Sequence, residues 1–99
     1  MVIVGGTFEI EPGQRDQFIA GRMEMMRTSR AEAGCLEYTF AADPLNPGRV
    51  VLYERWESQA ALDVHLAALR GGSSRPADVG VSSSSIVIYE VSGERPLGR

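Results

Sequence analysis

The sequence predicts an α+β protein of the ferredoxin-like type, with the order β-α-β-β-α-β and one four-stranded antiparallel sheet. Four segments are rich in β-branched and aromatic residues, and two others carry apolar residues at helical spacing. Glycine and proline separate these segments. At 99 residues the chain is long enough for one domain. We expect this domain over residues 1–93 and a flexible tail over 94–99.

The first strand and the first helix are expected before residue 34. β-branched and aromatic residues dominate residues 2–10, and Pro12 in the following turn ends the strand. Residues 14–33 predict a helix, because Gln, Arg, Met, Glu and Ala favour helices, and Gly34 would cap it. The expected apolar stripe consists of Phe18, Ile19, Met23, Met25, Met26 and Ala33. The charged residues expected to face water are Arg15, Arg22 and Glu24.

A hairpin is expected next. Residues 35–42 and 49–56 alternate as strands do, and residues 43–48 between them are rich in turn formers. One face of the first of these strands should carry Leu36, Tyr38 and Phe40, and the other Glu37 and Thr39.

The second helix is expected over residues 59–70, with Ser58 as its N-cap. One face of this helix should present Leu62, Leu66 and Leu69, with His65 beside them. Residues 71–84 are rich in glycine and serine and are expected to be mobile. The last strand is expected over residues 85–92.

Both helices of this topology cover the same face of the sheet, so nothing in the chain covers the other. Burial of that face against an identical chain is the simplest solution for so short a domain, and we therefore expect a homodimer.

Composition argues against several partners. The net charge is −3, and the ten basic residues are all arginines without a cluster, so nucleic acid is not expected. No apolar run approaches the roughly 18 residues of a membrane span. The first residues lack the positive charge of a secretory signal, which favours a cytoplasmic protein without a membrane partner. One cysteine, one histidine and no glycine-rich nucleotide motif predict no metal, haem, flavin or other cofactor.

Three adjacent motifs resemble the antibiotic biosynthesis monooxygenase family. They are residues 33–38 (AGCLEY), the hairpin over residues 43–54, and residues 56–66 (WESQAALDVHL). The family pattern is Pro-Gly-Cys, a hairpin, and then Y-E-x-W-x-S…A-L-x-x-H. The resemblance covers residues 2–70 and the last strand. It implies a dimeric α+β barrel, in which two sheets pack face to face.

The resemblance also implies a type of chemistry. Characterised family members include oxygenases that act on phenols or quinols without flavin or metal, and others degrade haem. The haem-degrading branch has an asparagine and a tryptophan where this chain has Gly6 and His65, which disfavours haem. The resemblance thus implies a cofactor-independent monooxygenase, or quinol oxygenase, using dioxygen and a small aromatic phenol, quinol or polyketide-like substrate. The absence of the family's second histidine after His65 keeps an alternative open, a non-catalytic dimeric protein that binds a small aromatic metabolite.

His65 is the candidate catalytic base, because a neutral imidazole can accept a phenolic proton near neutral pH. The alternative is a structural histidine that fixes the helix to the sheet by a hydrogen bond. The candidate substrate-binding residues, for each of which core packing is the alternative, are Trp56, Glu54, Arg22, Met26 and Phe18. A buried Glu54 would need a partner, for which Arg22 or His65 is expected.

Overall fold

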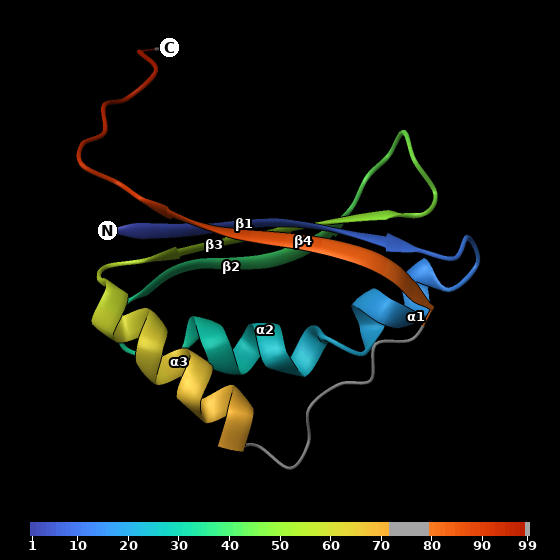
Figure 1. The fold of residues 1–99 in the computed structure, drawn as a ribbon, viewed down its shortest axis with the longest axis horizontal. Helices are drawn as coiled ribbons and strands as arrows, with labels where there is room; N and C mark the ends of the chain where they lie inside the picture. Colours follow the sequence, from blue (N-terminus) through green and yellow to red (C-terminus); the bar gives the residue numbers. More distant parts are fainter. Residues whose placement is uncertain (72–79, 99) are drawn as a thin grey trace.

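Four strands form a single antiparallel sheet in the computed structural model, which describes residues 1–71 and 80–98 (Figure 1). The strands are β1 (Val2–Ile10), β2 (Cys35–Ala42), β3 (Arg49–Trp56) and β4 (Val81–Glu90). Their order across the sheet is β2-β3-β1-β4, and each is antiparallel to its neighbours. The predicted ferredoxin-like sheet is therefore confirmed.

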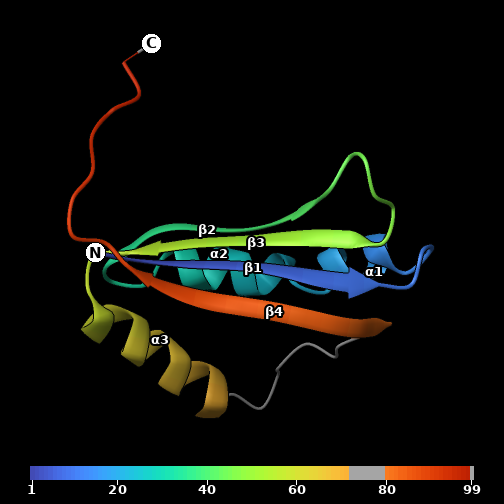
Figure 2. The same cartoon turned by 45° about the horizontal axis from the view of Figure 1, so that its top comes forward.

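The helices all lie on one face of this sheet (Figures 1 and 2). They are α1 (Arg15–Ala20), α2 (Met23–Arg30) and α3 (Gln59–Gly71). α1 and α2 run along the sheet, whereas α3 begins beside the end of β3 and slopes away from the sheet (Figure 1). None of the helices in the described residues is both long enough and apolar enough to cross a membrane.

The single helix predicted over residues 14–33 is wrong, because the structure breaks it at Gly21 and Arg22. The Arg22 amide donates to the carbonyl of Ile19, three residues back at 2.9 Å, so the last turn of α1 is tightened. Glycine is a poor helix former and a frequent site of such breaks. The break turns Arg22 inward, where it is 5% exposed instead of facing water, and leaves Met23 45% exposed.

The core lies between the helices and the sheet. Alternate residues of β1 and β3 point into it, which is the expected period of a half-buried strand. Phe8, Phe18 and Phe40 form an aromatic cluster with ring centroids 5.2 to 6.1 Å apart. Such ring pairs add about 0.5–1.5 kcal/mol each beyond the burial of their area.

Two strand predictions need correction. Leu36 is 42% exposed and not in the core, because the β2–β3 register shifts between Cys35 and Glu37. β4 runs over Val81–Glu90 and not over 85–92, so the segment 71–84 is not a loop throughout. Its residues 72–79 lie outside the described residues, whereas Val81, Ser83 and Ser84 pair with β1. Backbone pairing thus outweighs the weak strand preference of serine.

The opposite face of the sheet is left uncovered by the described part of the chain (Figure 1). Its large side chains include Tyr53, Val87 and Tyr89, which are 39%, 44% and 54% exposed. Gly5 lies under the ring of Tyr89, where a Cβ would come within 3.2 Å of the ring. After Glu90, residues 91–98 lead away from the sheet without helix or strand.

Candidate active site

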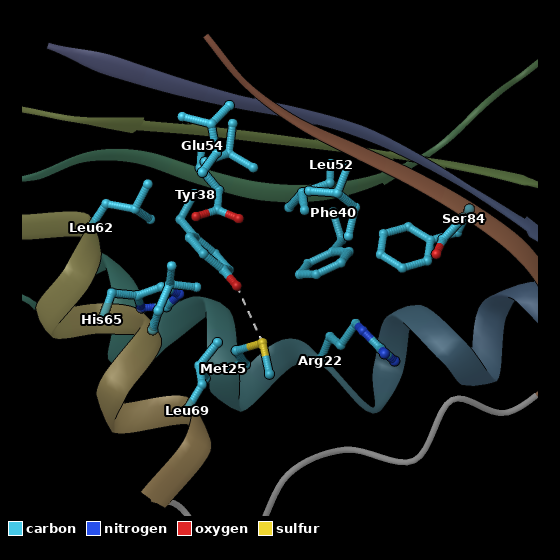
Figure 3. A pocket seen from close by; sticks show the side chains of 15 residues that line it. Arg22, Met25, Tyr38, Phe40, Leu52, Glu54, Leu62, His65, Leu69 and Ser84 are labelled. Atoms are coloured by element: carbon cyan, nitrogen blue, oxygen red, sulfur yellow. Dashed lines mark hydrogen bonds between the residues drawn. The ribbon is translucent and has the colours of Figure 1, made fainter. Parts of the chain in front are cut away.

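A cavity of about 320 Å³ lies between α3, the α1–α2 region and the covered face of the sheet (Figure 3). Its lining is mainly apolar, and it takes side chains from every strand. A volume of this size suits a small organic ligand. The polar side chains in the lining are Arg22, Tyr38, Glu54, His65 and Ser84.

We define the mouth of the cavity as its side between α3 and β4, where exposed lining residues lie. Leu66 and Leu69 line it from α3, and Ile86 and Ile88 line it from β4. Ile86 is 51% and Ile88 48% exposed, because α3 slopes away from this edge of the sheet. The mouth is therefore apolar, and within residues 1–71 and 80–98 its two isoleucines stay about half exposed.

The inner end of the cavity, formed by Tyr38, Glu54 and His65, lies opposite Arg22 and Ser84 (Figure 3). His65 projects from α3, whose start is fixed by Ser58: the Ala61 amide donates to the Ser58 hydroxyl at 3.1 Å, as predicted for an N-cap. His65 is 1% exposed.

The imidazole of His65 is held between two aromatic rings and a carboxylate. Its centroid lies 4.7 Å from that of Trp56, and 5.2 Å from that of Tyr38, which it meets edge-on. Nδ1 lies 3.0 and 3.2 Å from the two carboxylate oxygens of Glu32, in the loop between α2 and β2. Among the described residues, Nε2 has no hydrogen-bond partner. Glu32 was not among the predicted site residues, although it directly precedes the motif at residues 33–38.

Glu54 lies in the same buried cluster. Its Oε1 accepts a hydrogen bond from Trp56 Nε1 at 2.9 Å, a partner the sequence did not suggest. Burial raises the pKa of the Glu54 carboxyl, and the Trp56 hydrogen bond and the charge of His65 oppose this only in part. Trp56 itself is 0% exposed and does not line the cavity; it stands behind Glu54 and His65.

The Tyr38 hydroxyl completes the inner end. It donates to the Met25 sulfur at 3.3 Å (Figure 3). Burial, reinforced by the negative charge of Glu54, raises the pKa of Tyr38 far above its ordinary value. The hydroxyl therefore stays protonated at physiological pH.

Arg22 marks the opposite end of the cavity. Its guanidinium carbon lies 3.6 Å from the centroid of Phe18, and Nη1 reaches the Phe18 carbonyl at 3.5 Å. Phe18 and Met26 pack in the core and do not line the cavity; the Met26 sulfur accepts the Phe40 amide at 3.5 Å. Of the six predicted site residues, the structure brings His65, Glu54 and Arg22 to the cavity and places the other three behind its wall.

The lining residue Ser84 was also missed, because the sequence placed it in a mobile segment. Within the described residues, no three or more His, Cys, Asp or Glu side chains come together as a metal site would require.

Comparison with known proteins decides the family. The model of the antibiotic biosynthesis monooxygenase family matches residues 1–69. The chain belongs to this family. Family membership agrees with the geometry, because the match contains β1 to β3, most of α3 and the whole inner end of the cavity.

This antibiotic biosynthesis monooxygenase family member is also similar to individual proteins. It is 33% identical to the uncharacterised Synechocystis protein sll1783 over 64 residues. The aligned segment covers 65% of this chain and 44% of that protein. The chain thus spans less than half of this relative. It is 25% identical to Bacillus subtilis YcnE, provisionally named a monooxygenase, over 66% of this chain and 68% of YcnE.

Solved structures share the whole fold. Rv0793 from Mycobacterium tuberculosis superimposes with a TM-score of 0.75 at 26% identity, covering 96% of this chain and 98% of Rv0793. A Deinococcus radiodurans protein, provisionally assigned to the antibiotic biosynthesis monooxygenases, has a TM-score of 0.80 at 24% identity and covers 98% of both chains. At this identity the latter supports the fold alone.

Proposed function

We propose that this chain is a cofactor-independent monooxygenase, or quinol oxygenase, acting on a small aromatic phenol, quinol or polyketide-like substrate. The observation that carries the proposal is the position of His65 at the inner end of a mainly apolar cavity of about 320 Å³. Its Nε2 is the one ring nitrogen not already engaged by Glu32. A flat aromatic substrate would enter by the mouth and place its hydroxyl near this nitrogen.

The chemistry needs a base, an electron-rich substrate and dioxygen. His65 would take the phenolic proton on Nε2, and the resulting anion would pass an electron directly to dioxygen. Recombination at a ring carbon that carries hydrogen forms a peroxide anion, and His65 returns its proton to this anion to give a hydroperoxide. Loss of water from it leaves a new carbonyl. One oxygen atom thus enters the substrate, the other leaves as water, and the substrate supplies all the electrons.

Other side chains of the cavity would position the substrate. Phe8, Phe40 and Leu52 offer apolar contacts to a flat ring, and Arg22 lies at the far end. Trp56, Met26 and Phe18 would act from behind this wall, by keeping His65, Phe40 and Arg22 in place. A fixed geometry of this kind is the main contribution a protein makes when the substrate supplies the electrons.

The proposed assembly is a homodimer that buries the uncovered face of the sheet. The half-exposed Tyr53, Val87 and Tyr89 on this face support it, since such a patch favours an interface. Sedimentation at micromolar concentration should give twice the mass of one chain. A species of one chain's mass alone would refute the dimer.

A second candidate, a non-catalytic protein that binds a small aromatic metabolite, is favoured by the exposed isoleucines at the mouth. The half-exposed Ile86 and Ile88 would allow water to reach a bound ligand, which suits binding better than radical chemistry.

Oxygen uptake separates the two candidates. Purified protein, with a chelator present, is incubated with a panel of quinols and hydroxylated polyketide-like phenols, and Trp56 fluorescence is followed in parallel. Trp56 is the only tryptophan and touches His65, so its quenching reports on ligand at the inner end. Turnover that is lost in His65→Gln supports the monooxygenase. Saturable quenching without any oxygen uptake supports the binding protein.

A further inference from the structure

We propose that Glu32 is a positioning residue, whose carboxylate holds the neutral imidazole of His65 with its proton on Nδ1 and thereby presents the lone pair of Nε2 to the cavity. The role of Glu32 in catalysis rests on the proposed function. The position of the proton on Nδ1 can be tested without any substrate.

The contact between the two side chains is close and buried on the histidine side. Nδ1 lies within 3.2 Å of both Glu32 oxygens, and His65 is 1% exposed. A carboxylate is a hydrogen-bond acceptor only, so the ring nitrogen that faces it must carry the proton. In a neutral imidazole the other nitrogen then holds the lone pair.

The aromatic neighbours alone do not select this orientation. Trp56 and Tyr38 fix the plane of the imidazole at centroid distances of 4.7 and 5.2 Å. A ring turned over within the same plane would keep both contacts, but would move its nitrogens. Glu32 is the group in contact with His65 that distinguishes one edge of the ring from the other.

The backbone around Glu32 is itself fixed. The Glu32 amide donates to the Ser29 carbonyl at 3.0 Å at the end of α2, and the Glu32 carbonyl accepts from the Cys35 amide at 3.2 Å at the start of β2. The side chain, 28% exposed, therefore extends from a tight turn and not from a free loop.

Gly34 brings this turn against α3. Its φ is +84°, and a Cβ there would lie 2.7 Å from the Cβ of Ala61. Its carbonyl also accepts the Glu57 amide at 2.8 Å. Ala61 precedes His65 by one helical turn on the same face, so the close approach at Gly34 sets Glu32 within reach of the ring.

The same contact suits the imidazolium that forms when Nε2 accepts a proton. The charged and titratable groups that face His65 are the carboxylates of Glu32 and Glu54 and the hydroxyl of Tyr38. The proton moves from the substrate hydroxyl to Nε2, and Glu32 keeps the Nδ1 proton on the ring throughout. Glu32 thus touches only His65 and acts through it.

Nitrogen NMR tests the proposal directly, because His65 is the only histidine of the chain. Long-range ¹H–¹⁵N spectra are recorded at about pH 8.5, where an ordinary histidine is neutral. The wild type should show the proton on Nδ1. Glu32→Ala should shift the population several-fold toward Nε2–H, the tautomer that free histidine prefers.

Two further variants keep the test specific. Glu32→Gln should also shift the population toward Nε2–H, because its amide, unlike a carboxylate, can donate to a bare Nδ1. Glu57→Ala, which removes a neighbouring carboxylate lining the same surface depression as Glu32, should leave the spectrum unchanged. A wild-type ring protonated on Nε2, or a Glu32→Ala ring still protonated on Nδ1, would overturn the proposal.

Oxygen uptake by the same variants separates this proposal from the proposed function. If His65 is the base, turnover should fall at least about 10-fold in both Glu32→Ala and Glu32→Gln, because Nε2 then carries a proton and cannot accept one. An expected tautomer shift in a protein that oxidises no quinol would refute the monooxygenase and leave the role of Glu32 established. If the tautomer shifts in Glu32→Ala but turnover is unchanged, Glu32 has no role in catalysis.

Discussion

The inner end of the cavity consists of polar side chains with hydrogen-bond partners, whereas the mouth consists of partly exposed apolar side chains. At the inner end, Glu54 is paired with Trp56, His65 with Glu32, and Tyr38 with Met25. At the mouth, Leu66, Leu69, Ile86 and Ile88 line the cavity, and the two isoleucines stay about half exposed.

This difference suggests that the inner end serves the reaction and that the mouth serves ligand binding. Paired polar groups in a buried cluster have fixed orientations, and a reacting atom can be placed against them. Exposed apolar side chains have no directional partner, and any ligand that covers them lowers the free energy of the complex. We therefore expect substitutions at the inner end to change rate or stability, and substitutions at the mouth to change affinity.

The largest effect is expected at His65. His65→Ala should lower turnover roughly 10²- to 10⁴-fold, the usual contribution of a general base. His65→Gln should be equally inactive, since an amide cannot accept the proton. Oxygen uptake at saturating substrate measures both. Val64→Ala is the control, because Val64 neighbours His65 on α3 but is 69% exposed. An active His65→Gln protein would leave His65 with a structural role alone.

A large loss of stability is expected at Trp56. Trp56→Phe removes part of a fully buried side chain and the donor to Glu54. We expect a loss of about 2–4 kcal/mol in the free energy of unfolding, because a core void and an unpaired buried acceptor both contribute. Urea unfolding measures it.

A double-mutant cycle with Glu54→Leu isolates the hydrogen bond, because leucine has no acceptor for Trp56 Nε1. If the hydrogen bond matters, Trp56→Phe should cost less in the Glu54→Leu background than in the wild type. Strict additivity would mean that the loss comes from packing alone.

The same comparison shows what the sequence could predict. Strand alternation and helix periodicity depend on neighbouring residues, so β1, β3 and α3 were placed within a residue of their ends. The break at Gly21 was missed because only tertiary packing decides whether a helical glycine ends a helix. Its consequence, the burial of Arg22, was missed with it.

For the site as well, features that depend on neighbouring residues were predicted, and features that depend on tertiary packing were not. His65 and Glu54 were predicted as site residues because one stretch of the family pattern contains both, and both line the cavity. Glu32 was missed because it is 33 residues from His65, and its role depends on how the loop packs on α3. Ser84 was missed because its strand is built by pairing with β1 and not by its own preference.

A pH-dependent effect on stability is expected at Glu54. Burial raises the pKa of its carboxyl above the ordinary value of 4.5, so the folded state holds this proton to higher pH than the unfolded chain. The contribution of Glu54 to stability is therefore complete below pH 4.5 and is lost as the pH rises through the raised pKa. Relative to Glu54→Gln, the wild type should become less stable over this range. Urea unfolding between about pH 4 and 8 measures the difference, and parallel profiles would contradict the prediction.

The smallest effect is expected at the mouth. Ile88 is 48% exposed, so Ile88→Ala should change the free energy of unfolding by less than about 1 kcal/mol. A ligand that covers Ile88 would lose apolar contact worth about 1 kcal/mol, which corresponds to about a 5-fold rise in KM or Kd. The value of kcat should not change, because this contact is equally strong in the ground state and the transition state. Steady-state oxygen uptake and Trp56 quenching measure the two constants, with Val64→Ala as the exposed control. A fall in kcat without a change in KM would show that the mouth contributes to the chemical step, and would end the division between the two ends of the cavity.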